Sequence, residues 1–71
     1  MIKINLSKLL GERRMTQSEL AQITGIRPST ICEIYNEVCS RIRIDHLDSI
    51  CTALDCDITE LLTYINSENN S

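Results

Sequence analysis

Residues 17–36 read QSELAQITGIRPSTICEIYN, and this stretch predicts two short helices joined by a tight turn. The first helix is expected to begin at Gln17, because Thr16 and Glu19 have the spacing of a capping box, in which each side chain binds the backbone amide of the other residue. Gly25 then suits the left-handed position that ends a helix. The first helix should therefore span about two turns.

The second helix is expected to begin at Pro28, because proline lacks the amide hydrogen that would have no partner at a first helical position. Ile31 and Ile34 share one face of this helix, so the residues between them point elsewhere. The apolar positions of the first helix are Leu20, Ala21 and Ile23. Ala21 is small enough to let the two helices cross at close range, as a short turn requires.

Three further helices are predicted around this pair. One contains Leu6, Leu9 and Leu10 and ends near Gly11 or Arg13. The most regular apolar stripe in the chain consists of Leu47, Ile50, Cys51 and Leu54. A final short helix is capped by Asp57 with Glu60 three residues later. Its expected buried face consists of Ile58, Leu61, Leu62 and Ile65. The prediction is one all-α, five-helix domain over residues 1–65, followed by a disordered polar tail at residues 66–71.

Seven residues stand at the spacings of a known DNA-binding motif: Gln17, Leu20, Ala21, Gly25, Ile26, Ile31 and Ile34. Over about residues 5–65 the chain resembles the Cro and phage-repressor (Cro/C1-type, lambda-repressor-like) helix-turn-helix family. It is most similar to the compact subgroup in which an Arg-Ile pattern, here residues 41–45, follows the recognition helix. The resemblance implies a small transcriptional regulator, most simply a repressor, that binds double-stranded DNA sequence-specifically with residues 28–35 in the major groove. An ordinary helical hairpin would show the same spacing and is the plain alternative.

Site residues follow from position on the motif. Base contacts are expected from the exposed start and outer face of the recognition helix, namely Arg27, Pro28, Ser29, Thr30 and Glu33. Arg27 suits a guanine edge and Glu33 a cytosine amine, whereas Pro28 offers only an apolar contact. By resemblance, backbone phosphates are expected to meet Gln17, Asn36, Arg41, Arg43, Arg13 and Arg14. Phosphate contacts of this kind position a protein without reading sequence.

The net charge of −3 has the wrong sign for a DNA-binding protein, but its distribution changes that conclusion. Residues 1–43 hold all seven basic side chains and four acidic ones, a balance of +3. The remaining residues hold six acids and no Lys or Arg, a balance of −6. This asymmetry predicts one DNA-binding side and one outward or partner-facing side. Chance placement of surface charge remains the alternative.

The four cysteines, Cys32, Cys39, Cys51 and Cys56, do not show the pair spacing of zinc sites, and His46 is the only histidine. We expect no metal and no cofactor, with Cys51 and Cys56 packed as small apolar residues. A redox role for Cys32 or Cys39 and a pH-sensing or ligand role for His46 are minor alternatives to solvent exposure. The chain has neither a phosphate-binding glycine loop nor a catalytic triad, so it is not expected to be an enzyme.

A single domain of this size binds DNA weakly, so we expect a homodimer on half-sites about 34 Å apart. The expected interface is the acidic C-terminal part, with Leu62, Tyr64 and Ile65. Without a membrane-length apolar run or signal segment, the protein is expected to be cytoplasmic. The rival function is a protein-binding module, such as an antitoxin or adaptor with the same fold.

Overall fold

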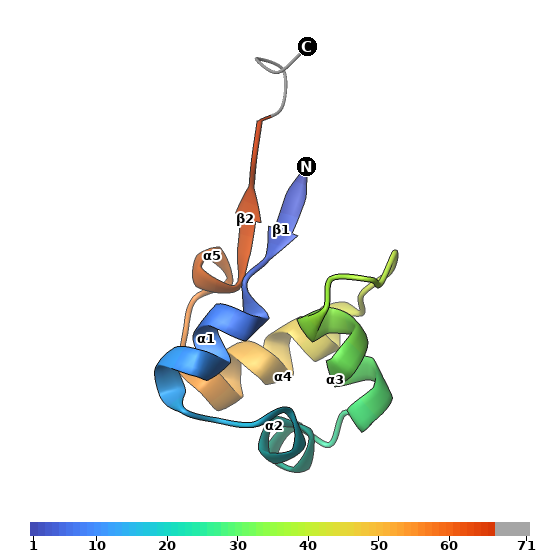
Figure 1. The fold of residues 1–71 in the computed structure, drawn as a ribbon, viewed down its shortest axis with the longest axis vertical. Helices are drawn as coiled ribbons and strands as arrows, with labels where there is room; N and C mark the ends of the chain where they lie inside the picture. Colours follow the sequence, from blue (N-terminus) through green and yellow to red (C-terminus); the bar gives the residue numbers. More distant parts are fainter. Residues whose placement is uncertain (67–71) are drawn as a thin grey trace.

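The structure of the protein is a computed structural model that describes residues 1–66. Its elements, in chain order, are β1 (Ile2–Ile4), α1 (Leu6–Arg13), α2 (Gln17–Thr24), α3 (Pro28–Tyr35), α4 (Ile44–Leu54), α5 (Ile58–Leu61) and β2 (Leu62–Tyr64). The predicted five-helix fold is confirmed, and the two short strands are added to it. Figure 1 shows the helices as one body from which the strand pair projects. Among the described residues, no helix has the length and apolar character needed to cross a membrane.

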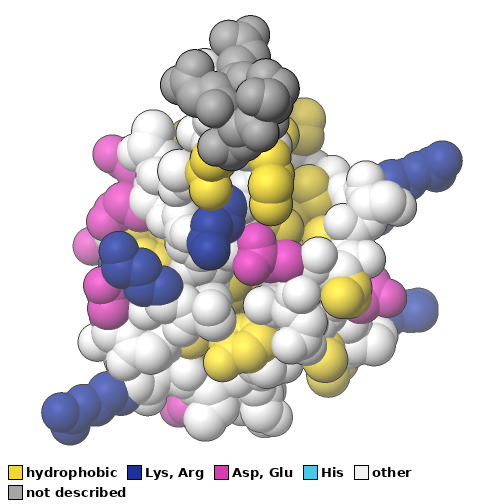
Figure 2. All heavy atoms as spheres, turned by 45° about the horizontal axis from the view of Figure 1, so that its top comes forward, with side chains coloured by type: hydrophobic (Ala, Val, Ile, Leu, Met, Phe, Trp, Pro, Cys, Tyr) yellow, Lys and Arg dark blue, Asp and Glu magenta, His cyan; other side chains and the backbone are white. Residues whose placement is uncertain are grey.

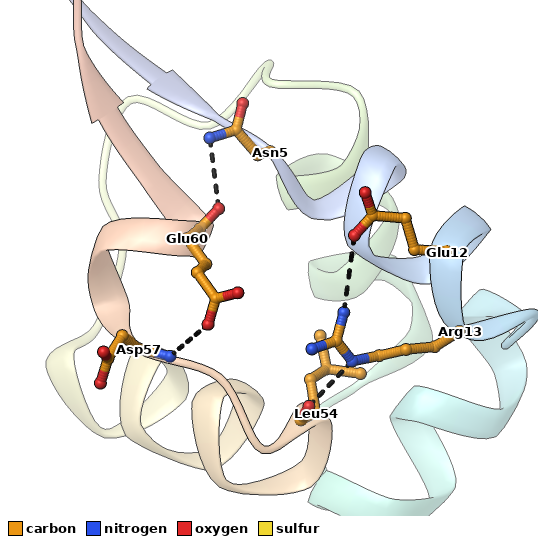
Figure 3. Close-up of polar contacts among 6 residues, drawn as sticks. All are labelled: Asn5, Glu12, Arg13, Leu54, Asp57 and Glu60. Atoms are coloured by element: carbon orange, nitrogen blue, oxygen red, sulfur yellow. Dashed lines mark hydrogen bonds and ion pairs between the residues drawn. The ribbon is translucent and has the colours of Figure 1, made fainter.

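The predicted helix starts are present as hydrogen bonds. The Thr16 hydroxyl accepts from the Glu19 amide at 3.1 Å, and the Glu19 carboxylate accepts from the Thr16 amide at 2.9 Å. At the start of α5, the Asp57 amide donates to the Glu60 carboxylate at 2.9 Å (Figure 3). Pro28 is the first residue of α3. Local capping chemistry therefore sets where these three helices begin.

Three helices end in a way that the sequence does not signal. Three residues other than glycine adopt left-handed backbone conformations there. Arg14 and Asp55 directly follow α1 and α4, with φ of 52° and 51°, and Glu37 is the second residue after α3, with φ of 58°. After each of these residues, the amide of the next residue donates to the carbonyl of the residue five positions before it. At the end of α3, for example, the Val38 amide donates to the Glu33 carbonyl at 3.0 Å. This is the Schellman arrangement that glycine usually completes. These ends therefore carry conformational strain that a glycine would remove.

A single core of Leu, Ile and Ala side chains fills the space between the helices. It consists of Leu6, Leu9, Leu10, Leu20, Ala21, Ile26, Ile31, Ile34, Ile50, Leu54 and Leu61. Helix α2 packs against α3 and α4, and α1 packs against α3 and α5. No polar or charged residue is buried among the described residues. Apolar packing therefore makes a major contribution to the orientation of α3.

The prediction for residues 61–65 was wrong in one respect. Helix α5 is a single turn, and the chain leaves it at Leu62 to form β2, which pairs antiparallel with β1 in the register Ile2–Tyr64 and Ile4–Leu62. We call this strand pair the ribbon. Ile58 and Ile65, expected to be buried, are 45% and 40% exposed. The spacing of these residues imitates a helical stripe, but pairing with the start of the chain, more than 55 residues away, determines the backbone.

Two smaller expectations have different outcomes. Ile23 is 59% exposed and does not belong to the buried face of α2, because it lies about 200° around the helix from Ala21. Cys51 and Cys56 are half-buried against the core, as predicted. Burial, and then the neighbouring Cys56, raises the pKa of the Cys51 thiol to about 11. The tail predicted at residues 66–71 lies outside the described residues except for Asn66.

Candidate DNA-binding surface

The turn between α2 and α3 is closed by hydrogen bonds that hold the two helices in a fixed relation. The Gly25 amide donates to the Ala21 carbonyl at 2.9 Å, with φ of 75° at Gly25. The Thr24 hydroxyl donates to the Leu20 carbonyl at 2.8 Å and accepts from the Ile26 amide at 3.2 Å. Sequence reasoning missed Thr24, although a threonine in the last helical turn commonly bonds the carbonyl four residues earlier.

Helix α3 has one fully buried face and one exposed face. Ile31 and Ile34 are 0% and 1% exposed. Of the residues predicted to contact bases, Arg27, Pro28, Ser29 and Glu33 are exposed and Thr30 is half-buried. The first turn contains no acidic residue, and Arg27 makes no side-chain capping bond there. The amide groups and positive dipole end of α3 are therefore open to an anionic group.

The loop from residue 36 to residue 43, which we call the α3–α4 loop, lies beside this exposed face. A hollow of about 350 Å³ is lined by Thr30 and Glu33 from α3 and by Arg41 and Arg43 from the loop. His46, expected to be solvated in the first turn of α4, is half-buried and lines the same hollow. The structure thus brings two predicted base contacts next to two predicted phosphate contacts.

The two loop arginines differ in what they already bind. Arg43 donates to the Asp45 carboxylate at 2.9 Å, and the two side chains are 71% and 69% exposed. A backbone hydrogen bond at Asp45, and then the Arg43 guanidinium, lower the pKa of the Asp45 carboxyl. Arg41 is exposed and forms neither an ion pair nor a hydrogen bond with the described residues. Arg41 is therefore the better placed of the two to bind an external anion.

Two other predicted phosphate contacts flank α3 and α2. The Asn36 amide group donates to the Cys32 carbonyl at 2.9 Å and to the Cys32 sulfur at 3.3 Å, so it caps the end of α3. Its neighbour Glu37 accepts from the Ile4 amide at 3.0 Å and joins the end of α3 to β1, a link that the sequence did not reveal. Gln17, half-buried, is the first residue of α2, where free backbone amides favour a phosphate.

Arg13 and Arg14 are adjacent in sequence but differ in surroundings. Arg14 is exposed. The Arg13 Nε donates to the Leu54 carbonyl at 2.8 Å, at the end of α4, and a terminal nitrogen lies 3.9 Å from the Glu12 carboxylate (Figure 3). The side chain of Arg13 is only 28% exposed. This arginine is thus engaged in holding α1 to α4, whereas Arg14 remains free for the predicted contact.

Comparison with known proteins places this geometry in a family. Residues 5–67 match the model of the Cro/C1-type HTH DNA-binding domain. The chain belongs to the Cro/C1-type helix-turn-helix family. Within it, the chain is 32% identical over 68 residues to the uncharacterized HTH-type transcriptional regulator YozG of Bacillus subtilis strain 168, covering 96% of this chain and 81% of that one.

A solved structure supports the same fold. The crystal structure of a Bacteroides fragilis protein, itself provisionally described as DNA-binding, superposes with a TM-score of 0.78. The superposition covers 89% of this chain and 100% of the Bacteroides fragilis chain. Because the two sequences are only 24% identical, the likeness concerns the fold. Together with the family match, it identifies α2 and α3 as the helix-turn-helix of a Cro/C1-type DNA-binding domain.

Proposed function

We propose that this Cro/C1-type protein is a transcriptional regulator that binds double-stranded DNA sequence-specifically with α3 in the major groove. The observation that carries the proposal is the two-sided character of α3. Buried Ile31 and Ile34 hold the helix, while Arg27, Ser29 and Glu33 are exposed on its outer side. Arginine can donate to a guanine edge, glutamate can accept from a cytosine amine, and serine can bond to more than one kind of base.

Phosphate contacts complete the proposed binding mode. We assign them to Gln17 and the first turn of α2 on one side, and to Asn36, Arg41 and Arg43 on the other. Arg14 extends this set, whereas Arg13 is assigned the structural role that its bond to Leu54 supports. The positive balance of residues 1–43 favours this side of the molecule for DNA.

We further propose that the protein acts in the cytoplasm and regulates by repression. Repression is the simplest mode, because blocking a promoter requires only that the site be occupied. The 32% identical YozG is named as a transcriptional regulator, which supports a role in the regulation of transcription. One recognition helix gives limited affinity, so we further propose a homodimer that reads two half-sites about 34 Å apart.

The experiment is a random-sequence DNA selection with the purified chain, read by sequencing. We expect enrichment of a palindrome whose half-sites are one helical turn apart. Glu33→Gln should change the preferred base at one position in each half-site, because glutamine replaces an acceptor suited to cytosine. Glu12→Gln is the matched control, because it makes the same charge change at an exposed position of α1 and should leave the preferred DNA site unchanged.

Two results would count against the proposal. No enrichment at moderate or low salt would favour the protein-binding module over the DNA-binding regulator. An enriched site that Glu33→Gln and Glu12→Gln leave equally unchanged would remove Glu33 from the base-reading set.

A further inference from the structure

The turn that ends α4 brings two cysteines together. The Asp55 amide donates to the Thr52 carbonyl at 3.3 Å, and the Cys56 amide donates to the Cys51 carbonyl at 3.0 Å. In this Schellman arrangement, the two residues that the second bond joins commonly pack their side chains against each other. Those residues are Cys51 and Cys56, which we call the thiol pair. The backbone that ends the helix therefore also places one thiol beside another.

The distance between the two cysteines suits a covalent bond. A carbonyl and an amide that lie 3.0 Å apart limit the separation of the two Cα atoms to about 7 Å, and a disulfide can bridge Cα atoms up to about that distance. Both residues are free thiols in the structure and are half-buried. Burial, and then the charge of Cys56 and a side-chain hydrogen bond with it, raise the pKa of the Cys51 thiol. The two thiols thus interact directly.

The thiol pair is accessible to small molecules and lies in a negative field. An open hollow of about 570 Å³ is lined by both cysteines together with Asp48, Asp55, Asp57 and Glu60. Figure 2 shows acidic side chains gathered along the left edge of the molecule, the side on which Figure 1 places α5. Carboxylates so placed disfavour a neighbouring thiolate and repel anionic reagents. A neutral reagent of low molecular weight reaches the pair without that repulsion.

The other two cysteines lie elsewhere on the molecule. The Cys32 sulfur, on α3, accepts from the Asn36 amide group at 3.3 Å. Cys39 lines the two hollows beside the α3–α4 loop. Neither of them lines the acidic hollow. Cys51 and Cys56 are therefore each other's nearest candidates for a disulfide.

We propose that the thiol pair is a reversible oxidation site, at which a neutral disulfide of low molecular weight, RSSR, converts Cys51 and Cys56 into an intramolecular disulfide. Because Cys51 holds its proton tightly, the exchange begins at Cys56. The Cys56 thiolate attacks one sulfur of RSSR, forms a mixed disulfide and releases RS⁻, which takes up the proton that Cys56 lost. Cys51 then gives up its proton, attacks the Cys56 sulfur and releases the second RSH. The chain loses two electrons and two protons, and the reagent gains them as two RSH.

The new bond fastens the end of α4 to the segment that leads into α5. Folding and oxidation are then linked, because a fold that holds the thiols together favours the disulfide, and the disulfide favours the fold by the same factor. A factor of ten would raise the Tm by roughly 6–11 °C for a domain of this size. In a cytoplasm that keeps thiols reduced, the pair is a dithiol and closes only when the thiol pool becomes oxidised.

Redox titration of the full 71-residue chain with 2-hydroxyethyl disulfide and 2-mercaptoethanol tests the proposal. Alkylation of the remaining thiols, followed by peptide mass spectrometry, identifies the joined cysteines. A bond between Cys51 and Cys56 should form in the wild-type chain and equally in a variant that carries Cys32→Ser and Cys39→Ser. Its equilibrium constant should be at least tenfold larger in buffer than in urea, and oxidation should raise the Tm. Cys51→Ala is the matched control, because its Tm should not rise under the same oxidising conditions.

Three results would overturn the proposal. The first is an equilibrium constant that is no larger in buffer than in urea. The second is a disulfide that joins Cys32, Cys39 or two separate chains in place of the thiol pair. The third is a bond between Cys51 and Cys56 that lowers the Tm, since the fold would then oppose it. None of these measurements contains DNA, so failure of the proposed function would appear separately, in the DNA selection.

Discussion

Replacing Arg13 by alanine separates a structural role from a DNA contact. In the structure, the Arg13 Nε donates to the Leu54 carbonyl at 2.8 Å, and the side chain is 28% exposed. Alanine would leave that carbonyl without this partner at the C-terminal end of α4, where a positive charge is favoured by the helix dipole. The stability of the domain, more than its DNA affinity, should therefore respond.

The magnitude follows from the two contacts that Arg13 makes. A hydrogen bond with a charged donor contributes about 1.5–3 kcal/mol, and partial exposure puts this one near the lower end of that range. The ion pair with Glu12, at 3.9 Å and with Glu12 55% exposed, adds little. We expect Arg13→Ala to lower the free energy of unfolding by about 2 kcal/mol, which corresponds to a fall in Tm of roughly 8–15 °C for a domain of this size.

The assay combines thermal unfolding with DNA titration. Lys8→Ala is the control, because Lys8 is exposed on the same helix and its loss should change the free energy of unfolding by less than about 0.5 kcal/mol. At a temperature where all proteins are folded, Arg13→Ala should keep the wild-type salt dependence of DNA binding. Wild-type stability together with a salt slope reduced by about 0.9 would refute this reasoning and restore Arg13 as a phosphate contact.

Other predictions concern the turn, the DNA contacts and one thiol. Gly25→Ala should destabilise the fold by about 1–2 kcal/mol, because its φ of +75° is unfavourable for alanine; no atom lies within 4 Å of the added carbon, so the cost is one of backbone conformation and not of steric clash. Gly11→Ala, at a helical position that is also unobstructed, should stabilise the fold by about 0.5–1 kcal/mol. Thermal unfolding of both variants decides, and shifts of the same sign would contradict the backbone argument. Arg41→Ala should weaken binding to all DNA sequences equally and reduce the salt slope by about one, whereas Arg27→Ala should cost about 1–3 kcal/mol on the selected site and relax one base position. Titrations of selected and random duplexes distinguish the two, and reversed behaviour would exchange their roles. Cys51, with its pKa raised to about 11, should react with iodoacetamide at pH 8 at least tenfold more slowly in the native chain than in urea, as followed by peptide mass spectrometry. Equal rates would show that the native thiol is not protected.

The sequence predicted those parts of the fold that local chemistry determines. Thr16 with Glu19, Asp57 with Glu60, and Pro28 each satisfy or remove free amides within one helical turn, so their effect can be read from neighbouring letters. The outer face of α3 was also predictable, because the spacing of Ile31 and Ile34 fixes which residues turn outward.

The ribbon could not be predicted in the same way. Ile2–Ile4 and Leu62–Tyr64 are three residues each, too short for alternation to stand out, and each acquires its structure only by pairing with the other. The spacing of Ile58, Leu61, Leu62 and Ile65 favours a helix until that pairing is considered. In the candidate site, the bond from Arg13 to Leu54 was hidden for the same reason, since it joins residues 41 apart.

The strained residue at the end of α3 shows how distant parts of this fold depend on one another. Glu37 occupies a left-handed conformation that costs an L-residue roughly 1–2 kcal/mol and that glycine would adopt freely. Glycine, however, has no carboxylate to accept the Ile4 amide, which points away from β2 at the edge of the ribbon. A charge-assisted bond of this kind contributes about as much as the strain costs. Glutamate therefore ends the helix and also fastens the N-terminal strand to it. Because one residue does both, a displacement of the ribbon must be transmitted to the end of α3 unless this bond breaks.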